Sequence, residues 1–407
     1  MNIQPVNKTT AELYEVEHSY KRFNQMNNLI IQMYWNEEIK KLENKRQENL
    51  QKYIKEKRAG YSLLDFAYFN GPLSFVDNIN YGINFCDQKA NSWSSDLASG
   101  KVDLDVFSPQ ELTTAIKKAS SMYGASDVGI APLDRRWFYS HWFDHNTKKS
   151  YPIHFSDEDE KYSYIKEPTL LENNIRVIPK EMKSVIVFIF EMSNECLKRS
   201  PTILPYGEGV NVYSKMSLLT MNIAGFIRTL GYNAIPSINC TALNIPLAID
   251  AGLGQLGRNG KLINPHLGSR IRIAKVITDM PLIHDKPINF GVTEFCDACR
   301  KCARECPVGA IPSGTRTRQP VDELGNAHYL RWPVNHKKCF EYWSECGTNC
   351  NICLYVCSYN RGYKWTKGIL NATHRDNSLI DTLLDGLEDD YGLELINKDS
   401  DDFWFKG

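Results

Sequence analysis

The sequence predicts an α/β fold of the α+β type, with a helical unit before the core and a cysteine-rich module after it. Two observations predict this arrangement. Between residues 106 and 290, apolar runs typical of strands alternate with helical periodicity, which is the pattern of a layered α/β core. Beyond residue 290, nine of the twelve cysteines fall within residues 296–357, which marks a separate module.

The expected parts are an N-terminal unit, the core, a surface insertion in the core, the cysteine-rich module and a C-terminal extension. In that order they cover residues 1–105, 106–131 with 183–290, 132–182, 291–365 and 366–407. In the N-terminal unit, helical spacing over residues 36–58 predicts an amphipathic helix. Aromatic residues between positions 61 and 93 are expected to pack a core.

Local signals place the elements of the core. Ser108, Pro109 and Glu111 form a capping box with proline at the first helical position, so a helix should begin there. The polar stretch 132–182 has histidines whose spacing matches no common metal site, and it is expected to be a surface insertion. Other helices are expected from about residue 215 to 230 and over 246–251. Strands are expected over residues 127–131, 185–190, 232–238 and 270–278.

The cysteine spacing predicts two iron-sulfur clusters. Four cysteines follow one another with two, two and three residues between them, and Pro307 comes next. This is the bacterial ferredoxin run, in which the fourth cysteine ligates a second cluster. Three later cysteines repeat part of the spacing, and Cys339 supplies the remaining ligand. The predicted 4Fe-4S ligands are a first cysteine set, Cys296, Cys299, Cys302 and Cys357, and a second cysteine set, Cys306, Cys339, Cys350 and Cys353.

Two alternatives to this assignment stay open. Cys346 also precedes Cys350 and competes with Cys339 as a ligand. A structural zinc site or disulfides would use the same residue type, but zinc usually takes CxxC pairs separated by a longer spacer. Four thiols within eleven residues favour a compact cluster instead.

A glycine-rich turn and three polar residues are the other candidate site features. The turn AGLGQLGRNG would let backbone approach a large cofactor, but it follows a helix and precedes a strand, so it is not a nucleotide fingerprint. Tyr213 is expected just ahead of a helix, where the dipole favours a phenolate. Asn239 follows a predicted strand. Arg272 alternates with apolar neighbours, so it should share a face with Ala274 and Val276 and need a polar or anionic partner.

Composition excludes some functions. Lys plus Arg and Asp plus Glu are equal at 48 each, so no general attraction to nucleic acid or anionic lipid is expected. The longest strongly apolar run, residues 185–190, is far shorter than the about 20 residues of a membrane span. The first residues contain neither a twin-arginine pair nor an apolar signal core. The protein is expected to be soluble, and either cytoplasmic, or exported and membrane-associated after removal of a leader.

Several of these segments resemble the corrinoid-dependent reductive dehalogenases, and the likeness is nearest to the respiratory chloroethene-type members. It is carried by VTEFCDACRKCARECP, DKPINFGV, MNIAGFIRTLGYNAIPS, AGLGQLGRNG and the ending DDFW. The resemblance implies a nitroreductase-like core that holds a base-off cobalamin, and a ferredoxin-like module with two 4Fe-4S clusters that feeds it electrons. The implied cobalamin contacts are Gly252, Gly254, Gly257, Asn259 and Gly260.

The resemblance also implies roles for individual residues. Tyr213 would donate a proton, Arg272 would stabilise its anionic form, and Asn239 would orient the donor or the halogen. Trp343 matches an aromatic wall of the substrate pocket. The first cysteine set would hold the cluster nearer to cobalt.

The implied partners are a small organohalide, a chlorinated aliphatic compound by this reading, and an external low-potential electron donor. The resemblance is compatible with a small membrane-anchor protein and with an oligomer. Two other functions are alternatives. An epoxyqueuosine reductase would share the cofactors but act on tRNA, and it should carry an acidic proton donor where this chain has Val212. A non-catalytic electron carrier would not need so long a chain outside the cysteine-rich module.

Overall fold

A four-stranded antiparallel sheet forms the centre of the computed structural model, which describes residues 3–79, 107–322, 324–361 and 400–405. The two middle strands pair along their whole length, with Arg272 opposite Phe190. The uninterrupted apolar run of β7 is typical of a strand buried on both faces. In spatial order the strands are β2 (Asp127–Pro132), β7 (Ser184–Glu191), β11 (Ile271–Thr278) and β8 (Ala234–Ser237).

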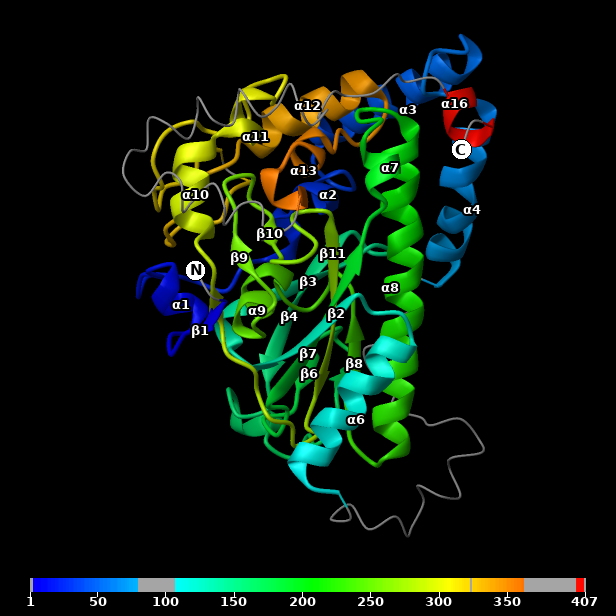
Figure 1. The fold of residues 1–407 in the computed structure, drawn as a ribbon. Helices are drawn as coiled ribbons and strands as arrows, with labels where there is room; N and C mark the ends of the chain where they lie inside the picture. Colours follow the sequence, from blue (N-terminus) through cyan, green and yellow to red (C-terminus); the bar gives the residue numbers. More distant parts are fainter. Residues whose placement is uncertain (1–2, 80–106, 323, 362–399, 406–407) are drawn as a thin grey trace.

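Two helices cover one face of this sheet. Helix α6 (Pro109–Met122) begins at the predicted capping box, in which the Ser108 side chain and Glu111 exchange hydrogen bonds. Helix α8 (Ile203–Thr229) runs along the length of the sheet (Figure 1). Apolar residues of both helices pack against β2, β7 and β11 in one buried cluster. This burial supplies most of the stability of the helices, because isolated helices are marginal in water.

Helix α8 is longer than expected. The prediction of a start near residue 215 is wrong, because the helix begins at Ile203 and has 27 residues. Gly207 and Gly209 lower the helix propensity of the first part of α8, so the sequence pattern did not predict a helix there. Gly207 is needed there, since a Cβ would lie 2.9 Å from the Tyr68 ring. No helix in the described ranges, α8 included, is long and apolar enough to cross a membrane.

The opposite face of the central sheet is covered by helix α9 (Asn244–Asp250) and by a second sheet. The second sheet lies within residues 132–182, which were expected to be a polar surface insertion. It has a buried side instead, because Phe138 and Phe155 are fully covered against the apolar cluster of the core. Its strands are too short for a clear alternating pattern. In spatial order they are β3 (His141–Asp144), β4 (Lys149–Phe155), β6 (Arg176–Ile178) and β5 (Thr169–Leu170).

Helices of the N-terminal unit lie against the rest of the chain. Helix α3 (Glu37–Lys55) confirms the predicted amphipathic helix, and Asn49 donates a hydrogen bond to the Ser344 carbonyl of the cysteine-rich module. Helix α4 (Leu63–Ile79) lies beside α8 (Figure 1). Part of the expected aromatic segment, residues 80–93, falls outside the described residues, as does most of the C-terminal extension. Short elements of the N-terminal unit are β1 (Gln4–Pro5), α1 (Thr10–Leu13) and α2 (Leu29–Gln32). The C-terminal extension contributes α16 (Ser400–Phe405).

The cysteine-rich module packs at the end of the sheet where β11 begins (Figure 1). There Ser269 donates hydrogen bonds to the Leu354 carbonyl and to the Asn360 side chain, at 2.9 and 3.0 Å. Its helices are short because glycine, proline and left-handed residues interrupt them. They are α10 (Val292–Cys299), α11 (Lys301–Arg304), α12 (His336–Cys346) and α13 (Ile352–Tyr355). Short elements nearby are α7 (Asn194–Leu197), β9 (Gln255–Leu256), β10 (Leu262–Ile263) and β12 (Ile288–Asn289).

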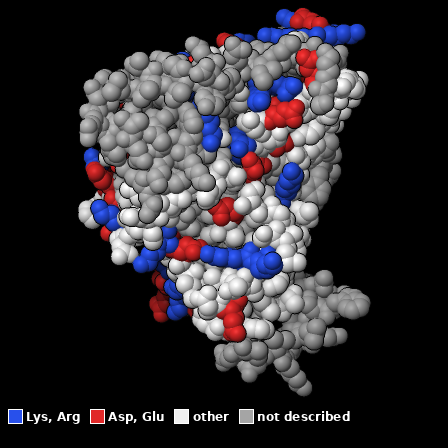
Figure 2. Space-filling model, viewed as in Figure 1, with Lys and Arg blue, Asp and Glu red and all other residues white. Residues whose placement is uncertain are grey.

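The visible surface carries charges of both signs. On the face that Figure 2 shows, Lys and Arg are interspersed with Asp and Glu over the described residues. This mixture agrees with the equal numbers of basic and acidic residues in the chain. The expectation that the protein does not bind nucleic acid stays a prediction.

The contact between α9 and β2 makes a stability prediction. A Cβ added at Gly129 in β2 would lie 2.1 Å from the Ala251 carbonyl oxygen. Gly129→Ala should therefore lower the free energy of unfolding by about 1–3 kcal/mol or more, because backbone must shift to admit the methyl group. Chemical denaturation measures this difference.

The matched control is Gly225→Ala in α8, where a Cβ would meet nothing within 4 Å. This change should raise the free energy of unfolding by about 0.5–1 kcal/mol, because alanine favours the helix. Equal stability of Gly129→Ala and the wild type would show that α9 does not press on β2 as described.

Candidate active site

The polar residues Tyr213, Asn239 and Arg272 lie together at one end of the central sheet. Asn239 Nδ2 donates a hydrogen bond to Tyr213 Oη at 2.7 Å. The Arg272 guanidinium carbon lies 5.9 Å from the centre of the Tyr213 ring. These residues come from α8, from the loop after β8 and from β11, so the fold gathers side chains that are far apart in the sequence.

The sheet register explains why they meet. The β8–β11 pairing ends at Ser237 and Lys275, and β11 continues past it. Arg272 lies on this continuation and shares the α8 face with Ala274 and Val276, as predicted, since both belong to the apolar cluster under α8. Helix α8 accommodates the guanidinium at Gly209, where a Cβ would lie 3.4 Å from Arg272 Nη2.

Arg272 has a donor to spare. Its side chain is partly buried, and among the described residues its buried Nε has no hydrogen-bond partner. Buried donors are normally satisfied, so an orphaned one at a site calls for a partner. The position suits a negatively charged or strongly accepting group beside the Tyr213 ring.

Tyr213 lies inside α8, so the helix-dipole argument for it was wrong. It is ten residues beyond Ile203 in the helix, and the dipole effect is confined to the first turn. What acts on the phenol oxygen is the Asn239 amide. The ring itself packs between two apolar clusters, one under α8 and one formed with Phe69, Ile203 and Val210.

The loop that carries Asn239 is held by Asn244 at the start of α9. Asn244 Nδ2 donates to Asn239 Oδ1 at 3.0 Å and to the Ile238 carbonyl at 2.9 Å. In the same loop Thr241 has a φ of 69°. A positive φ is unfavourable for a β-branched residue, and such strain concentrates at functional sites. Asn244 was missed from the sequence, since nothing local ties its amide to Asn239.

The first cysteine set converges. All four of its side chains line one pocket, together with Arg258, Lys301 and Tyr359. Burial raises the pKa of the Cys357 thiol to about 11, and repulsion from Cys299 adds to the rise. Burial likewise raises the pKa of the other three, Cys296, Cys299 and Cys302. Thiols in this state keep their protons until a metal takes over the charge, which is the setting of a buried metal-cluster site.

The second cysteine set is also close together. Burial raises the pKa of Cys339 to about 12, and the charges of Cys353 and Cys306 contribute while Lys261 opposes them. The pKa of Cys350 is raised well above its usual value, mainly by burial and also by Cys353 and Cys339. Among the described residues, no three His, Cys, Asp or Glu side chains form a site for a single metal ion. The zinc alternative and the cluster assignment both stay predictions.

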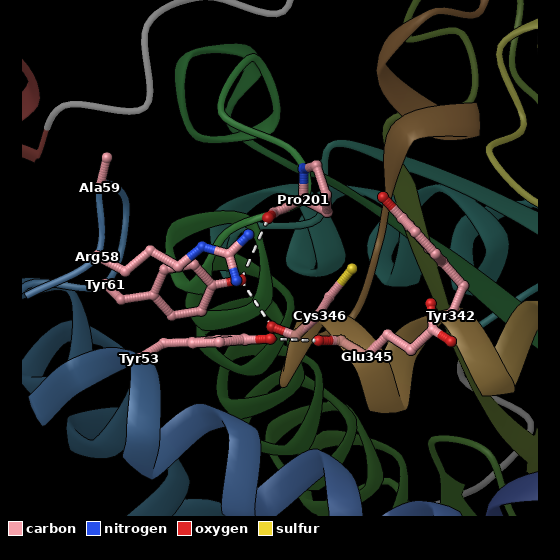
Figure 3. Close-up of a pocket in the computed structure, with 8 residues that line it drawn as sticks. All are labelled: Tyr53, Arg58, Ala59, Tyr61, Pro201, Tyr342, Glu345 and Cys346. Carbon is pink, nitrogen blue, oxygen red and sulfur yellow. Dashed lines mark hydrogen bonds between the residues drawn. The ribbon is translucent and has the colours of Figure 1, made fainter. Parts of the chain in front are cut away.

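Cys346 faces a different space. Its side chain lines a pocket of about 180 Å³ with Tyr53, Arg58, Tyr61 and other residues, and its sulfur points toward the gap between Pro201 and Tyr342 (Figure 3). The Cys346 carbonyl accepts a hydrogen bond from Tyr61 Oη at 2.7 Å. Cys346 also interacts electrostatically with Cys350. Cys339 interacts electrostatically with Cys306 and Cys353, and its assignment as the ligand stays a prediction.

The glycine-rich turn fits closely against the chain itself. A Cβ at Gly252 would lie 2.6 Å from the Lys286 carbonyl oxygen, and one at Gly254 would lie 2.2 Å from the Ile263 carbonyl oxygen. A Cβ at Gly257 would meet the Ile263 side chain at 2.9 Å. Close internal packing thus explains these three glycines, and their contact with a corrinoid stays a prediction, as does that of Gly260.

The same turn joins the core to the cysteine-rich module through Arg258, which the sequence analysis missed. Arg258 is 1% exposed and donates hydrogen bonds to the carbonyls of Cys296, Pro312 and Gly314. Its neighbour Asn259 donates to the Cys353 carbonyl at 3.2 Å. A lone arginine among glycines was the available signal. Asn259 thus contacts the second cysteine set, while its expected contact with cobalamin is untested.

Two further interactions concern the predicted roles of Trp343 and of the two cysteine sets. The Trp343 indole interacts with the Cys339 thiol and lies 5.8 Å from the Phe340 ring, so it belongs to the cysteine-rich module. Its role as a pocket wall stays a prediction. Arg272 acts electrostatically on Cys353, a member of the second cysteine set. Cys302 of the first set and Cys353 of the second set both pack against the apolar cluster under α8, and the expectation that the first set lies nearer to cobalt stays a prediction.

Several curated reductive dehalogenases are similar to the chain. The tetrachloroethene reductive dehalogenase of Sulfurospirillum multivorans is 36% identical over 327 residues, which are 77% of this chain and 65% of that protein. That of Dehalobacter restrictus is 38% identical over 280 residues, 64% of this chain and 50% of that protein. An epoxyqueuosine reductase of Cyclobacterium marinum is 33% identical over 135 residues, only 32% of this chain and 40% of that protein.

Solved structures agree on the fold. The catabolic reductive dehalogenase NpRdhA, in a K488Q variant, matches 98% of this chain and 50% of its own, with a TM-score of 0.69 and 21% identity. A reductive dehalogenase structure described for B12-dependent dehalogenation gives a TM-score of 0.68 at 20% identity, and covers 98% of this chain and 51% of its own. No protein-family model matches. The chain spans 50–65% of the length of the two tetrachloroethene enzymes. The chain is a homologue of the reductive dehalogenases, a class of oxidoreductases.

Proposed function

We propose that the chain catalyses reductive dehalogenation of an organohalide, with a chlorinated aliphatic compound as the substrate class. The observation that carries the proposal is the hydrogen bond from Asn239 to Tyr213, with Arg272 beside the same ring. Three polar side chains converge there at the edge of apolar clusters, which is the composition of a site for an apolar substrate that needs one proton. The tetrachloroethene enzymes among the relatives support this substrate class.

The reaction consumes two electrons and one proton. The carbon–halogen bond breaks, halide leaves, and a carbon–hydrogen bond forms in its place. When bound, cobalamin would supply the strong reductant for bond cleavage, and two 4Fe-4S clusters would bring it electrons singly from an external low-potential donor. The chain's own residues would supply the proton and hold the substrate.

Tyr213 is the proposed proton donor. Because its oxygen accepts a hydrogen bond from Asn239 Nδ2, its own O–H remains available to donate toward the substrate. Loss of the proton leaves a phenolate, and Arg272 lies close enough to stabilise that charge. A positioned general acid of this kind contributes about 10²- to 10⁴-fold to a rate.

The cluster ligands are proposed as the sequence predicted them. The first cysteine set would hold one 4Fe-4S cluster and the second cysteine set the other. Buried thiols with raised pKa values and nearby cations, Arg258 for the first set and Lys261 for the second, suit clusters whose negative charge needs compensation. The cluster of the first set is proposed as the one nearer to cobalt, as the family resemblance implies.

The nitroreductase-like character of the core, the base-off form of cobalamin and its contacts with the glycine-rich turn remain part of the proposal. The Nε of Arg272, which has no hydrogen-bond partner among the described residues, is compatible with a further acceptor group in the site. The electron donor, a membrane-anchor protein, an oligomer and the cellular location are proposed only as the family resemblance suggests them.

Replacing the phenol tests the proton donor. Tyr213→Phe keeps the ring packing but removes the hydroxyl, so halide release from a chlorinated ethene should fall by about 10²-fold or more. Cobalt and iron contents should match those of the wild type. Halide release by reconstituted protein with a low-potential reductant measures the rate.

Tyr164→Phe is the control for this substitution, because Tyr164 is 73% exposed and lies in the second sheet region. Its rate should equal that of the wild type. Near-normal turnover of Tyr213→Phe would remove Tyr213 from its role. If the wild type releases no halide from chlorinated ethenes, ethanes, methanes or phenols but reduces epoxyqueuosine in tRNA, the proposed function is wrong.

A second pair of variants tests the ligand assignment. Cys339→Ser should lose about half of the cluster iron, since one ligand of the second cluster is gone. Cys346→Ser should keep its iron, because that sulfur faces the pocket in Figure 3. Iron analysis and electron paramagnetic resonance of the reconstituted proteins report both. The reverse result, with iron lost only from Cys346→Ser, would exchange the two assignments.

A further inference from the structure

A chain of hydrogen bonds leads from the phenol through the sheet edge to a buried lysine. Lys275 is fully buried on β11, next to Ala274 and Val276 in the sequence, so its side chain points to the face opposite Arg272. Its Nζ donates to Asn244 Oδ1 at 2.6 Å and to the Ile238 carbonyl at 3.2 Å. Asn244 in turn donates to Asn239, and Asn239 to Tyr213.

The lysine sets the direction of every bond in this chain. An ammonium group can only donate, so Asn244 must present its oxygen to Lys275 and its NH₂ to Asn239. Asn239 must then accept the hydrogen bond from Asn244 with its side-chain oxygen and donate one to Tyr213 with its NH₂. The Tyr213 oxygen is thereby fixed as an acceptor, with its O–H turned away from Asn239.

Backbone carbonyls hold Asn244, the middle residue of this series of hydrogen bonds. Asn244 Nδ2 also donates to the Ile273 carbonyl at 2.9 Å, on the part of β11 that continues beyond β8. Because β8 ends at Ser237, no strand pairs with this part of β11 on that side, and the hydrogen bonds can connect the two faces of the sheet there. The side chain of Asn244 is thus anchored at both its oxygen and its nitrogen.

We propose that Lys275 and Asn244 are positioning residues that orient the Asn239 amide so that the Tyr213 hydroxyl is directed to the substrate. The orientation of the Asn239 amide follows from these hydrogen bonds. Its effect on the rate of dehalogenation rests on the proposed function. Cys240 is the titratable group that acts on Lys275, and its presence opposes the loss of the lysine's proton. Burial lowers the pKa of Lys275 to about 8, which leaves it mainly protonated at neutral pH.

Reversing one link tests the proposal. Asn244→Asp keeps the shape and the bond from Lys275 but offers no donor to Asn239. The Asn239 amide should therefore turn over, and Tyr213 should change from hydrogen-bond acceptor to donor. The C–O stretch of the phenol, recorded in the infrared on holoenzyme with ¹³C-labelled tyrosine, reports this change, and subtraction of the Tyr213→Phe spectrum identifies the band.

Lys275→Met is the second variant, because it removes the donor that sets the direction. Its Tyr213 band should shift or broaden as the amides lose their fixed orientation, and kcat should fall about tenfold or more with little change in KM. Lys161→Met is the control, since the Lys161 side chain is 62% exposed. The control should leave both the band and the rate unchanged.

The infrared band tests the orientation of Tyr213, and kcat tests whether that orientation matters for the reaction. A shifted Tyr213 band in Asn244→Asp, in protein whose unfolding transition matches that of the wild type, supports the positioning role even if no dehalogenation is found. An unmoved band in Asn244→Asp overturns it, whatever Lys275→Met does. A moved band with wild-type kcat keeps the geometry but overturns its catalytic consequence.

Discussion

The hydrogen bond between Asn239 and Tyr213 is the interaction on which the functional account depends. It exists because β11 continues past the end of β8, which places a loop, a helix face and a strand within reach of one another. The Tyr213 ring packs against apolar residues on α8, while its hydrogen bond with Asn239 is exposed. The site therefore depends on the register of the central sheet as much as on its side chains.

The cysteine-rich module must be held in a fixed position relative to this site. Arg258 does this by donating to three carbonyls of the module from a fully buried position. Buried arginine is costly unless its donors are satisfied, so the tight glycine turn and the arginine act together. Arg272 completes the link, because it faces Tyr213 on one side and acts on Cys353 on the other.

Much of the fold could be predicted because its signals are local. The capping box at Ser108, the strand runs and the alternation around Arg272 all depend on neighbours in the sequence, and the structure confirms them. The cysteine spacing predicted a shared site for the first cysteine set, and its four side chains line one pocket, while the cluster itself stays a prediction. The family resemblance added the expectation that Tyr213 and Asn239 act together.

The rest depended on tertiary contacts that a pattern does not contain. Gly207 concealed the first turns of α8, since its need for space comes from Tyr68 in another helix. The short strands of residues 132–182 acquire a buried side only against the core. Asn244 and Lys275 are joined to Asn239 by bonds between separate elements, although a lysine within the apolar strand of β11 was a visible signal.

The most direct test of the account is the position of cobalt in the reconstituted protein, located by anomalous scattering at the cobalt edge. Cobalt is expected on the side of Tyr213 that faces away from Asn239, with space for a small organohalide between the metal and the phenol oxygen. Cobalt bound elsewhere, or separated from Tyr213 by the chain itself, would contradict it.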